Sequence, residues 1–183
     1  MSVEAELAGL VPDRDTVLTV GVFDGVHLGH KYLISQLIEQ ARKQDLLPGV
    51  VTFSQHPQEV LAPRTRLPFL TDLAERSRLL TNEGVEFIAP LSFTADLARL
   101  GARQFLGLLK KHLHMRGLVT GPDFALGQNR EGNPDTLRTL GQEMGFTVTV
   151  VPPAVINGEV VSSTAIRKAL AEGDMKKVSR FAG

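Results

Sequence analysis

The sequence predicts an α/β fold in which helices flank a parallel sheet, and two observations support this prediction. Short apolar runs rich in β-branched residues alternate with longer segments whose apolar residues have helical spacing. Residues 16–53 have the order strand, helix, strand, and such a unit joins strands that run parallel. The length of 183 residues fits one sizeable domain, which we expect over residues 15–183 after an N-terminal segment of residues 1–14.

The first half of the chain is predicted to alternate strictly between strands and helices. Residues 31–44 repeat apolar side chains three and four positions apart, as an amphipathic helix does. A second helix is predicted over residues 71–81, with Thr71 as its N-cap and Gly84 just past its end. The predicted strands of this half are residues 16–23, 47–53 and 85–90.

The second half continues the same alternation. Asn133 followed by Pro134 is a typical helix start, and Gly145 ends that helix after Met144. Asp174 is expected to cap a last short helix. The other helices are predicted over residues 102–112 and 164–172, and the strands over residues 118–121, 147–151 and 160–162.

Three irregular stretches remain, at residues 54–68, 123–133 and 152–159. In a parallel α/β domain the loops that follow strands form the ligand crevice. Two of these stretches follow predicted strands and are rich in polar residues. We therefore expect them to contribute to a binding site.

The composition excludes several classes of function. Lys plus Arg equals Asp plus Glu, so no net charge attracts nucleic acid or an anionic membrane, and the scarcity of aromatic residues argues against base stacking. The chain has no cysteine, which excludes disulfides, thiolate metal sites and a cysteine nucleophile. No apolar run approaches the length of a membrane span, and the acidic N-terminus does not resemble a signal peptide, so the cytoplasm is the expected location.

The segment 21–30, GVFDGVHLGH, is the first candidate for chemistry, because it links the first predicted strand to the first helix. Gly25 and Gly29 permit tight turns and close approach of a ligand, and helix N-terminal amides favour phosphate. His27 and His30, three residues apart, can face one ligand and donate hydrogen bonds to a phosphate in a transition state. The alternatives are a turn with two incidental histidines and a zinc site made of His27, His30 and His56, although no acidic partner has a recognisable metalloenzyme spacing.

The segment 161–167, VSSTAIR, opens a late predicted helix. Its hydroxyls and amides suit phosphate, and Arg167 follows one turn later as a permanently charged donor. Ser and Thr at a helix start are equally well explained as ordinary caps.

Two further segments carry polar residues after strands. Residues 121–132, GPDFALGQNREG, include Asp123, Phe124, Asn129 and Arg130, and an ordinary surface loop is the alternative. Residues 52–57, TFSQHP, taken alone, are most simply interpreted as a core phenylalanine and a histidine in a turn. In a parallel sheet all four segments would converge on the carboxyl edge of the strands.

These motifs together resemble those of the nucleotidylyltransferase superfamily. The pattern G-x-F-D-G-V-H-x-G-H is followed in order by T-F-x-x-H-P-x-x-V-L, G-x-D-F-x-x-G-x-x-R-x-G and V-S-S-T-A-I-R. From about residue 15 to residue 183 the chain is similar to the FMN adenylyltransferase module of the bacterial bifunctional riboflavin kinase/FAD synthetases. The resemblance implies a Rossmann-like parallel sheet, in a single domain with a short C-terminal helical connector.

The resemblance also implies the reaction, which is ATP plus FMN giving FAD plus pyrophosphate with Mg²⁺. The FMN phosphate would attack the α-phosphate of ATP directly, so the protein needs no nucleophilic side chain and acts by positioning and charge stabilisation. Mg²⁺ would be held mainly by the phosphates rather than by protein ligands. The alternatives are an adenylyltransferase for another phosphorylated acceptor, such as phosphopantetheine or nicotinamide mononucleotide, and a flavin- or nucleotide-binding module without turnover.

The site residues implied by the resemblance fall into three groups. The catalytic residues are His27, His30 and Arg167. The ATP side comprises Gly21, Phe23, Asp24, Gly25, His30, Asp123, Ser163, Thr164 and Arg167. The flavin side comprises Phe53, His56, Pro57, Asp123, Phe124 and Arg130.

The sequence departs from the family pattern at three points. Val160 stands where some relatives carry an arginine, and Leu126 stands where a phenylalanine is common. The bifunctional enzymes continue into a riboflavin kinase barrel, whereas this sequence stops about where that module begins. We therefore expect no riboflavin kinase domain in these residues, and FMN from a separate riboflavin kinase or a missing C-terminal kinase module.

Overall fold

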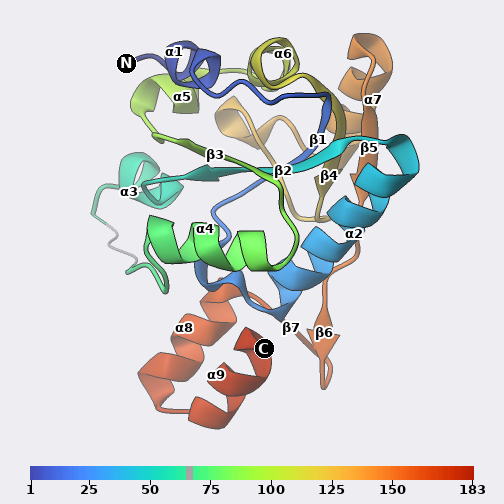
Figure 1. Ribbon diagram of the computed structural model, residues 1–183. Helices are drawn as coiled ribbons and strands as arrows, with labels where there is room; N and C mark the ends of the chain where they lie inside the picture. Colours follow the sequence, from blue (N-terminus) through green and yellow to red (C-terminus); the bar gives the residue numbers. More distant parts are fainter. Residues whose placement is uncertain (65–67) are drawn as a thin grey trace.

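The central sheet has five parallel strands, as predicted, in the order β3-β2-β1-β4-β5 (Figure 1). The computed structural model describes residues 1–64 and 68–183, so part of the predicted irregular stretch 54–68 lies outside the described residues. Strands β1 and β2 are buried along their whole length, which explains their continuous apolar sequence. The strands are β1 (Thr16–Val20), β2 (Leu47–Phe53), β3 (Phe87–Leu91), β4 (Met115–Thr120) and β5 (Thr147–Val150).

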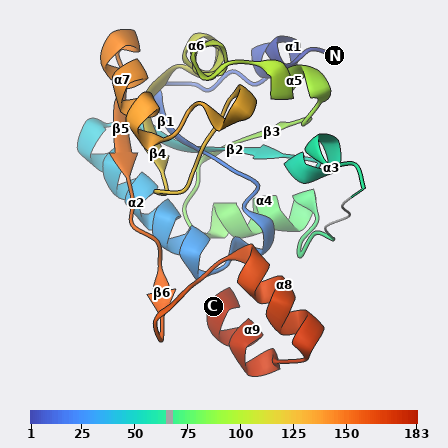
Figure 2. The same cartoon turned by 180° about the vertical axis from the view of Figure 1, so that it is seen from behind.

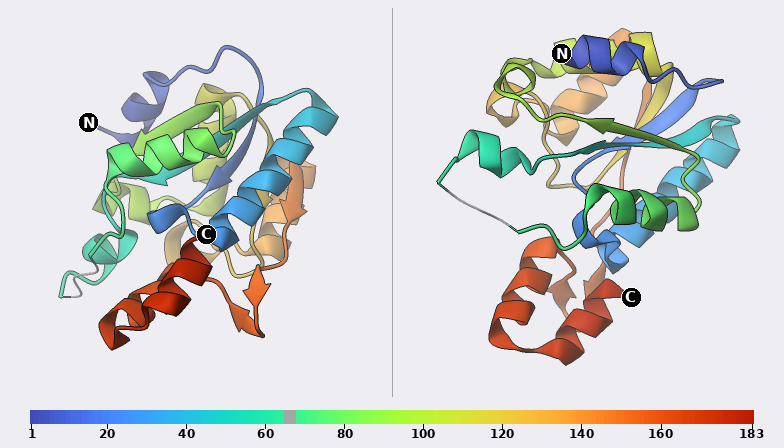
Figure 3. Two further views of the ribbon diagram at one scale, coloured as in Figure 1. Left: turned by 60° about the horizontal axis from the view of Figure 1, so that its bottom comes forward. Right: turned by 60° about the vertical axis from the view of Figure 1, so that its left-hand side comes forward.

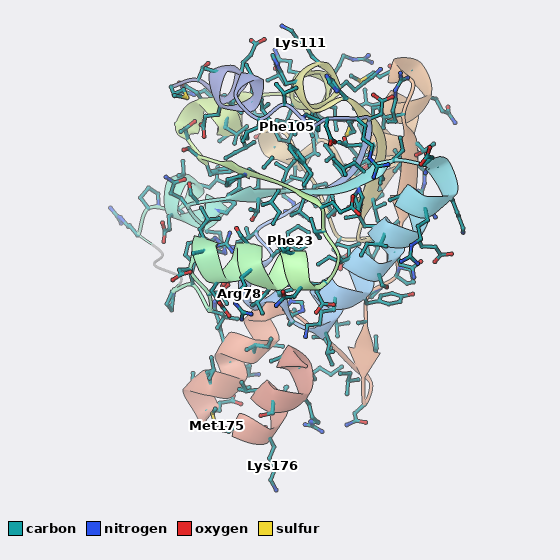
Figure 4. All side chains as sticks on the ribbon, viewed as in Figure 1. Phe23, Arg78, Phe105, Lys111, Met175 and Lys176 are labelled. Carbon is teal, nitrogen blue, oxygen red and sulfur yellow. The ribbon has the colours of Figure 1, made fainter. Side chains whose placement is uncertain are left out.

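Helices cover both faces of this sheet (Figures 1 and 2). One face carries α1 (Val3–Ala8), α5 (Ala95–Arg99), α6 (Ala102–Leu113) and α7 (Pro134–Met144). The opposite face carries α2 (Leu28–Gln44) and α4 (Leu73–Asn82). Figure 4 shows Phe105 on the first face and Phe23 on the second, and each belongs to the apolar core of its own side.

The C-terminal part forms a separate lobe at one end of the molecule (Figure 3). A two-stranded antiparallel hairpin, β6 (Val155–Ile156) and β7 (Glu159–Val160), leads into α8 (Ser163–Glu172) and α9 (Met175–Ala182). Val161, Ile166 and Phe181 form a small core between these elements. The short strand predicted at residues 160–162 is therefore a hairpin strand and not part of the main sheet.

Several predicted boundaries were wrong, each for a local reason. Strand β1 ends at Val20 rather than at residue 23, because Phe23 adopts a left-handed conformation (φ 54°) that leaves the ladder. Asp72, not Thr71, caps α4 by accepting a hydrogen bond from the Glu75 amide. The short helices α1, α3 (Pro57–Leu61) and α5 were not predicted, because five or six residues carry too little periodicity. The caps predicted at Asn133, Gly145 and Asp174 are confirmed.

Candidate active site

The strand order places the candidate site at the switch point of the sheet. The chain proceeds from β1 outward to β2 and β3, then returns to the other side of β1 with β4 and β5. Ligands of open α/β sheets bind outside the carboxyl ends of the strands at such a point. The loops that follow β1 and β4, and the loop after β2, contain three of the four predicted motifs.

The turn between β1 and α2 has an unusual backbone. Phe23, Gly25 and Val26 all have positive φ, at 54°, 81° and 41°. Positive φ is ordinary for Gly25 and uncommon for a β-branched residue such as Val26. A Cβ on Gly25 would also lie 3.0 Å from the Leu70 side chain. This conformation directs the chain sharply from the strand to the start of α2.

His27 caps α2 with its own ring. Its Nδ1 accepts a hydrogen bond from the His30 backbone N–H at 3.3 Å, and the residue is only 4% exposed. Because Nδ1 accepts, the proton of a neutral ring is on Nε2, which is left as a donor. The rings of His27 and His30 stack with their centroids 3.6 Å apart, and Phe23 meets His30 edge-on at 5.1 Å.

Both histidines are held in the neutral form. Burial lowers the pKa of His27 to about 4, partly offset by Asp24 and reinforced by Arg167. Burial, followed by the neighbouring His27 and Arg76, lowers the pKa of His30 well below its usual range. At neutral pH these rings therefore act as uncharged hydrogen-bonding groups.

Asp24 lies at the centre of a buried hydrogen-bond network. Its carboxylate accepts from the backbone N–H groups of Leu70 (2.8 and 3.0 Å) and Thr71 (3.0 Å) and from the Thr71 hydroxyl. It also forms an ion pair with Arg167, whose Nε donates to the Pro68 carbonyl at 3.2 Å. The Asp24 carbonyl accepts from the Ser163 hydroxyl at 2.9 Å. The network joins the first turn, the segment before α4 and the start of α8.

The start of α8 is capped by Ser162, whose hydroxyl accepts from the Ala165 backbone N–H at 3.1 Å. The alternative of an ordinary helix cap, given for this Ser/Thr run from the sequence, is confirmed for Ser162. Thr164 is exposed and lines neither of the two clefts described below.

The loop after β4 folds back on itself. Leu126 and Gly132 exchange two backbone hydrogen bonds of 3.2 and 2.8 Å, and a Cβ on Gly132 would approach the Leu126 carbonyl to 2.6 Å. Asn129 and Arg130 both have left-handed φ, and the Arg130 guanidinium donates to the Asp123 carbonyl at 3.1 Å. The loop is thus a defined structure that presents Phe124, Asn129 and Arg130 to a cleft.

The first cleft, of about 520 Å³, is largely apolar and lies over the ends of β1 and β2. The rings of Phe53 and Phe93 meet edge-on in it, with centroids 5.2 Å apart. The predicted flavin-side residues that line it are Phe53, His56, Pro57, Phe124 and Arg130, together with Gly21 from the predicted ATP side.

The second cleft, of about 340 Å³, lies at the N-termini of α2 and α8. Two helix N-termini offer free N–H groups and positive dipole ends to an anion. The predicted residues that line it are His27, His30, Asp123, Phe124 and Ser163. Phe124 lines both clefts, which therefore adjoin.

Five predicted ATP-side residues line neither cleft: the exposed Thr164 and four others. Phe23 is buried in the core below α2, and Asp24 and Arg167 are paired with each other. Gly25 forms the turn, where its N–H donates to the Thr71 hydroxyl at 3.1 Å. In this arrangement these residues support the walls of the clefts.

Arg76 is a buried residue that sequence reasoning missed. It lies on α4 and is 0% exposed, and its Nη1 donates to the Thr52 hydroxyl (3.0 Å) and the Phe53 carbonyl (2.7 Å). The available signal was its spacing from Leu73 and Leu80, which places a charged residue on the helix face that carries apolar side chains.

Two features are absent from the part of the chain that the structure describes. Within residues 1–64 and 68–183, no group of three His, Cys, Asp or Glu side chains is arranged to hold a metal ion, so the zinc alternative with His27, His30 and His56 is not formed. In the same residues, no helix is both long and apolar enough to cross a membrane.

Comparison with known proteins gives consistent matches. A family model described as FAD synthetase matches residues 11–165. The bifunctional riboflavin kinase/FMN adenylyltransferase of Escherichia coli K12 is 38% identical over 173 residues, which cover 94% of this chain and 55% of the relative. The protein of the same name from Pseudomonas fluorescens is 36% identical, over 93% of this chain and 55% of the relative. The chain thus spans about half the length of these relatives.

A solved structure shares the fold. It is described as a macrolide-efflux protein from Streptococcus pneumoniae and superposes with a TM-score of 0.88 at 30% sequence identity. The match covers 97% of this chain and 58% of that one. The Rossmann-like architecture predicted from the sequence is therefore confirmed.

Proposed function

The chain belongs to the FAD synthetase family, and we propose that it is an FMN adenylyltransferase. A phosphate oxygen of FMN bonds to the α-phosphorus of ATP, and the bond from that phosphorus to the bridging oxygen of the β-phosphate breaks. FAD forms and pyrophosphate leaves with the electron pair.

One observation carries this proposal, which is the pair of adjoining clefts that share Phe124. The first cleft is apolar and lined by four phenylalanines, which suits the flat isoalloxazine ring. The second cleft has two helix N-termini and suits the polyphosphate of ATP. The boundary between them is where the phosphate of FMN would meet the α-phosphate of ATP.

In this arrangement the protein acts by positioning and by hydrogen bonding. The Nε2–H of His27 donates to the α-phosphate as charge develops on it, and the amides at the start of α2 and α8 hold the remaining phosphate oxygens. The ring of His27 is fixed by its cap, so little reorganisation accompanies the reaction.

Mg²⁺ is part of the proposal as a partner of the phosphates. Among the described residues that line the two clefts, the single carboxylate is that of Asp123, which fits a metal held mainly by phosphate oxygens. When bound, Mg²⁺ supplies charge neutralisation to the leaving pyrophosphate.

The names of the relatives pair this activity with riboflavin kinase. We propose a riboflavin kinase as the source of FMN, as a separate protein or as a C-terminal module. We also propose that the reaction takes place in the cytoplasm, with which a cysteine-free chain is compatible.

The direct test incubates the protein with ATP, Mg²⁺ and FMN and separates the flavins by chromatography. We expect FAD from FMN and none from riboflavin, which lacks the attacking phosphate. Phosphopantetheine and nicotinamide mononucleotide serve as alternative acceptors. Bound FMN without any FAD would replace the enzyme by a binding module, and turnover of another acceptor would replace the substrate.

The His27→Ala variant tests the role of the ring. We expect turnover to fall about a hundredfold or more while the Kd for FMN changes little, because the donor acts on the transition state. His112→Ala is the matched control, since His112 lies on α6 and pairs with Glu4, away from both clefts. Equal losses of turnover and FMN affinity would make His27 a ground-state ligand instead.

A further inference from the structure

Arg76 makes a set of contacts that reach both the first cleft, which is the flavin-side cleft of the proposed function, and the turn that precedes His27. The Thr52 hydroxyl accepts from Arg76 and donates to the Val22 carbonyl at 2.9 Å, so a two-step relay connects α4 through β2 to the loop after β1. A second bond from the same Nη1 holds the Phe53 carbonyl. Val22 and Phe53 both line the first cleft.

A third contact runs through an aromatic ring. The Arg76 guanidinium lies 4.8 Å from the centroid of the Phe69 ring, and Phe69 lies 5.9 Å from the ring of His56, which also lines the first cleft. His56 in turn caps α3, because its Nδ1 accepts from the Gln58 backbone N–H at 3.2 Å. The buried Arg76 side chain thus contacts Phe53 directly. It is connected to Val22 through Thr52 and to His56 through Phe69, and all three connected residues line this cleft.

The burial of Arg76 is unfavourable for the stability of the fold. Its Nε and Nη2 are buried and have no hydrogen-bond partner among the described residues, and each such group costs stability. Burying a charge also costs stability unless the charge is paired and fully hydrogen-bonded. Its contacts therefore fix a geometry more than they hold the fold together.

We propose that Arg76 is a positioning residue that fixes the floor of the flavin-side cleft against the turn leading to His27, so that the FMN phosphate meets the α-phosphate of ATP in line. The proposal rests on the proposed function. Arg76 lines neither cleft and acts through Thr52, Phe53 and Phe69.

The test uses Arg76→Met, with Arg78→Met as the matched control. Arg78 lies on the same helix but is exposed and paired with Glu75 (Figure 4). We expect Arg76→Met to keep or raise the urea midpoint of unfolding, while kcat/KM for FMN falls about a hundredfold, since misplacement of reacting groups by about 1 Å has effects of that size. The KM for ATP should stay within about threefold, and Arg76→Lys, which keeps a buried donor, should recover about tenfold.

The outcomes separate this proposal from the proposed function. Wild-type activity of Arg76→Met, or an equal loss in Arg78→Met, would overturn the positioning role. A loss of stability together with full activity of the folded fraction would show a structural role. If the wild type makes no FAD, the proposed function fails, and the affinity for FMN, measured by flavin fluorescence, still tests the role of Arg76. A higher Kd for FMN in Arg76→Met supports its contacts with the cleft, and an unchanged Kd overturns the proposal.

A second variant covers the case in which Arg76→Met does not fold. Thr52→Val has nearly the same shape and removes the hydroxyl that connects Arg76 to Val22. Arg76 stays in place and keeps its hydrogen bond to the Phe53 carbonyl. We expect it to lower kcat/KM for FMN about tenfold and to leave the KM for ATP within about threefold. Unchanged kinetics in Thr52→Val would overturn the proposed relay.

Discussion

The state of His27 illustrates how burial sets chemistry at the level of one residue. Its ring is enclosed, capped onto α2 and stacked on His30, and it is neutral because charging it would require desolvating a cation. A neutral donor that is already oriented adds a hydrogen bond to a phosphate without bringing a mobile charge. His27 should accordingly add no acidic limb near the usual histidine pKa to the pH–rate profile of FAD formation, and a limb near pH 6 belongs to the FMN phosphate, whose second pKa is about 6.

The same burial makes stability depend on pH. The pKa of His27 falls from an ordinary 6.5 to about 4 on folding, so the unfolded chain binds more protons between these values. The free energy of unfolding should therefore decrease as pH falls from 6.5 to 4, by about 3 kcal/mol for a shift of this size. Urea unfolding across this range would measure it.

His27→Asn provides the control, because asparagine is a good N-cap and does not titrate. We expect a shallower loss of stability in this variant than in the wild type over the same pH range. Parallel curves for the two proteins would mean that other groups cause the pH dependence.

Asp24 is the residue for which a single change should be most disruptive to the site. Asp24→Asn removes the charge that pairs with Arg167 and one of the acceptors of the Leu70 and Thr71 amides. Removing one member of a buried pair leaves its partner uncompensated, and we expect a loss of about 3 kcal/mol in the free energy of unfolding. Chemical denaturation measures this directly.

Asp135→Asn is the matched control for that measurement. Asp135 also pairs with an arginine, Arg138, but its side chain is 95% exposed. Its substitution should leave the stability nearly unchanged, since exposed ion pairs contribute little. Similar losses in the two variants would contradict the central role of Asp24.

At the residue level, the sequence motifs predicted residues that line the candidate site but not the residues that support it. His27, Phe53 and Phe124 line the clefts as the motifs predicted, because residues after parallel strands share one edge of the sheet. Asp24 and Arg167 were predicted as ATP-side residues and are found paired with each other, an interaction across the chain that spacing does not reveal. Whether ATP binds these residues stays a prediction.

At the level of elements, long periodic segments were predicted well and short ones were not. Helices α2, α6 and α7 have apolar stripes, and α7 also has the start at Asn133 and the stop at Gly145 that were predicted. Helix α1 has six residues, and its role follows from tertiary contacts, since Leu7 is completely buried against the core and the Glu6 carboxylate accepts from the Ser92 backbone N–H. Residues 1–14 thus contribute to the fold.

Leu7→Ala tests this contribution of α1. Truncating a fully buried leucine leaves a cavity, and we expect a loss of about 3 kcal/mol in the free energy of unfolding by urea. Val11→Ala is the control, because Val11 is 67% exposed and its truncation should have little effect. A small effect of Leu7→Ala would mean that α1 is not part of the cooperative core.

At the level of the whole molecule, the two clefts should be separable by substitution. Ala98 lines only the flavin-side cleft, and Ala154 lines only the cleft at the helix N-termini. Ala98→Phe should abolish FMN binding and retain binding of a non-hydrolysable ATP analogue, because the larger ring fills one cleft and leaves the other open. Ala154→Phe should do the reverse.

Flavin fluorescence and calorimetry with the ATP analogue would measure these two affinities for each variant. Because each variant serves as the control for the other, a general loss of folding would appear as a loss of both affinities. Loss of both ligands in two well-folded variants would contradict the assignment of one ligand to each cleft.

The order of the strands also has a consequence for how the chain folds. The pairing of β1 with β4 joins residues that are far apart in the sequence, such as Thr16 and Met115. The other three strand pairings join residues much closer in the sequence: Thr16 with Leu47, Gly49 with Phe87, and Gly117 with Thr147. Closing the longest loop costs the most chain entropy, so this pairing should be among the last to form. Residues that follow these two strands line both clefts. A refolding chain should therefore gain its secondary structure before it gains the capacity to bind a nucleotide. Added nucleotide should leave the folding rate unchanged and should lower the unfolding rate of the folded protein.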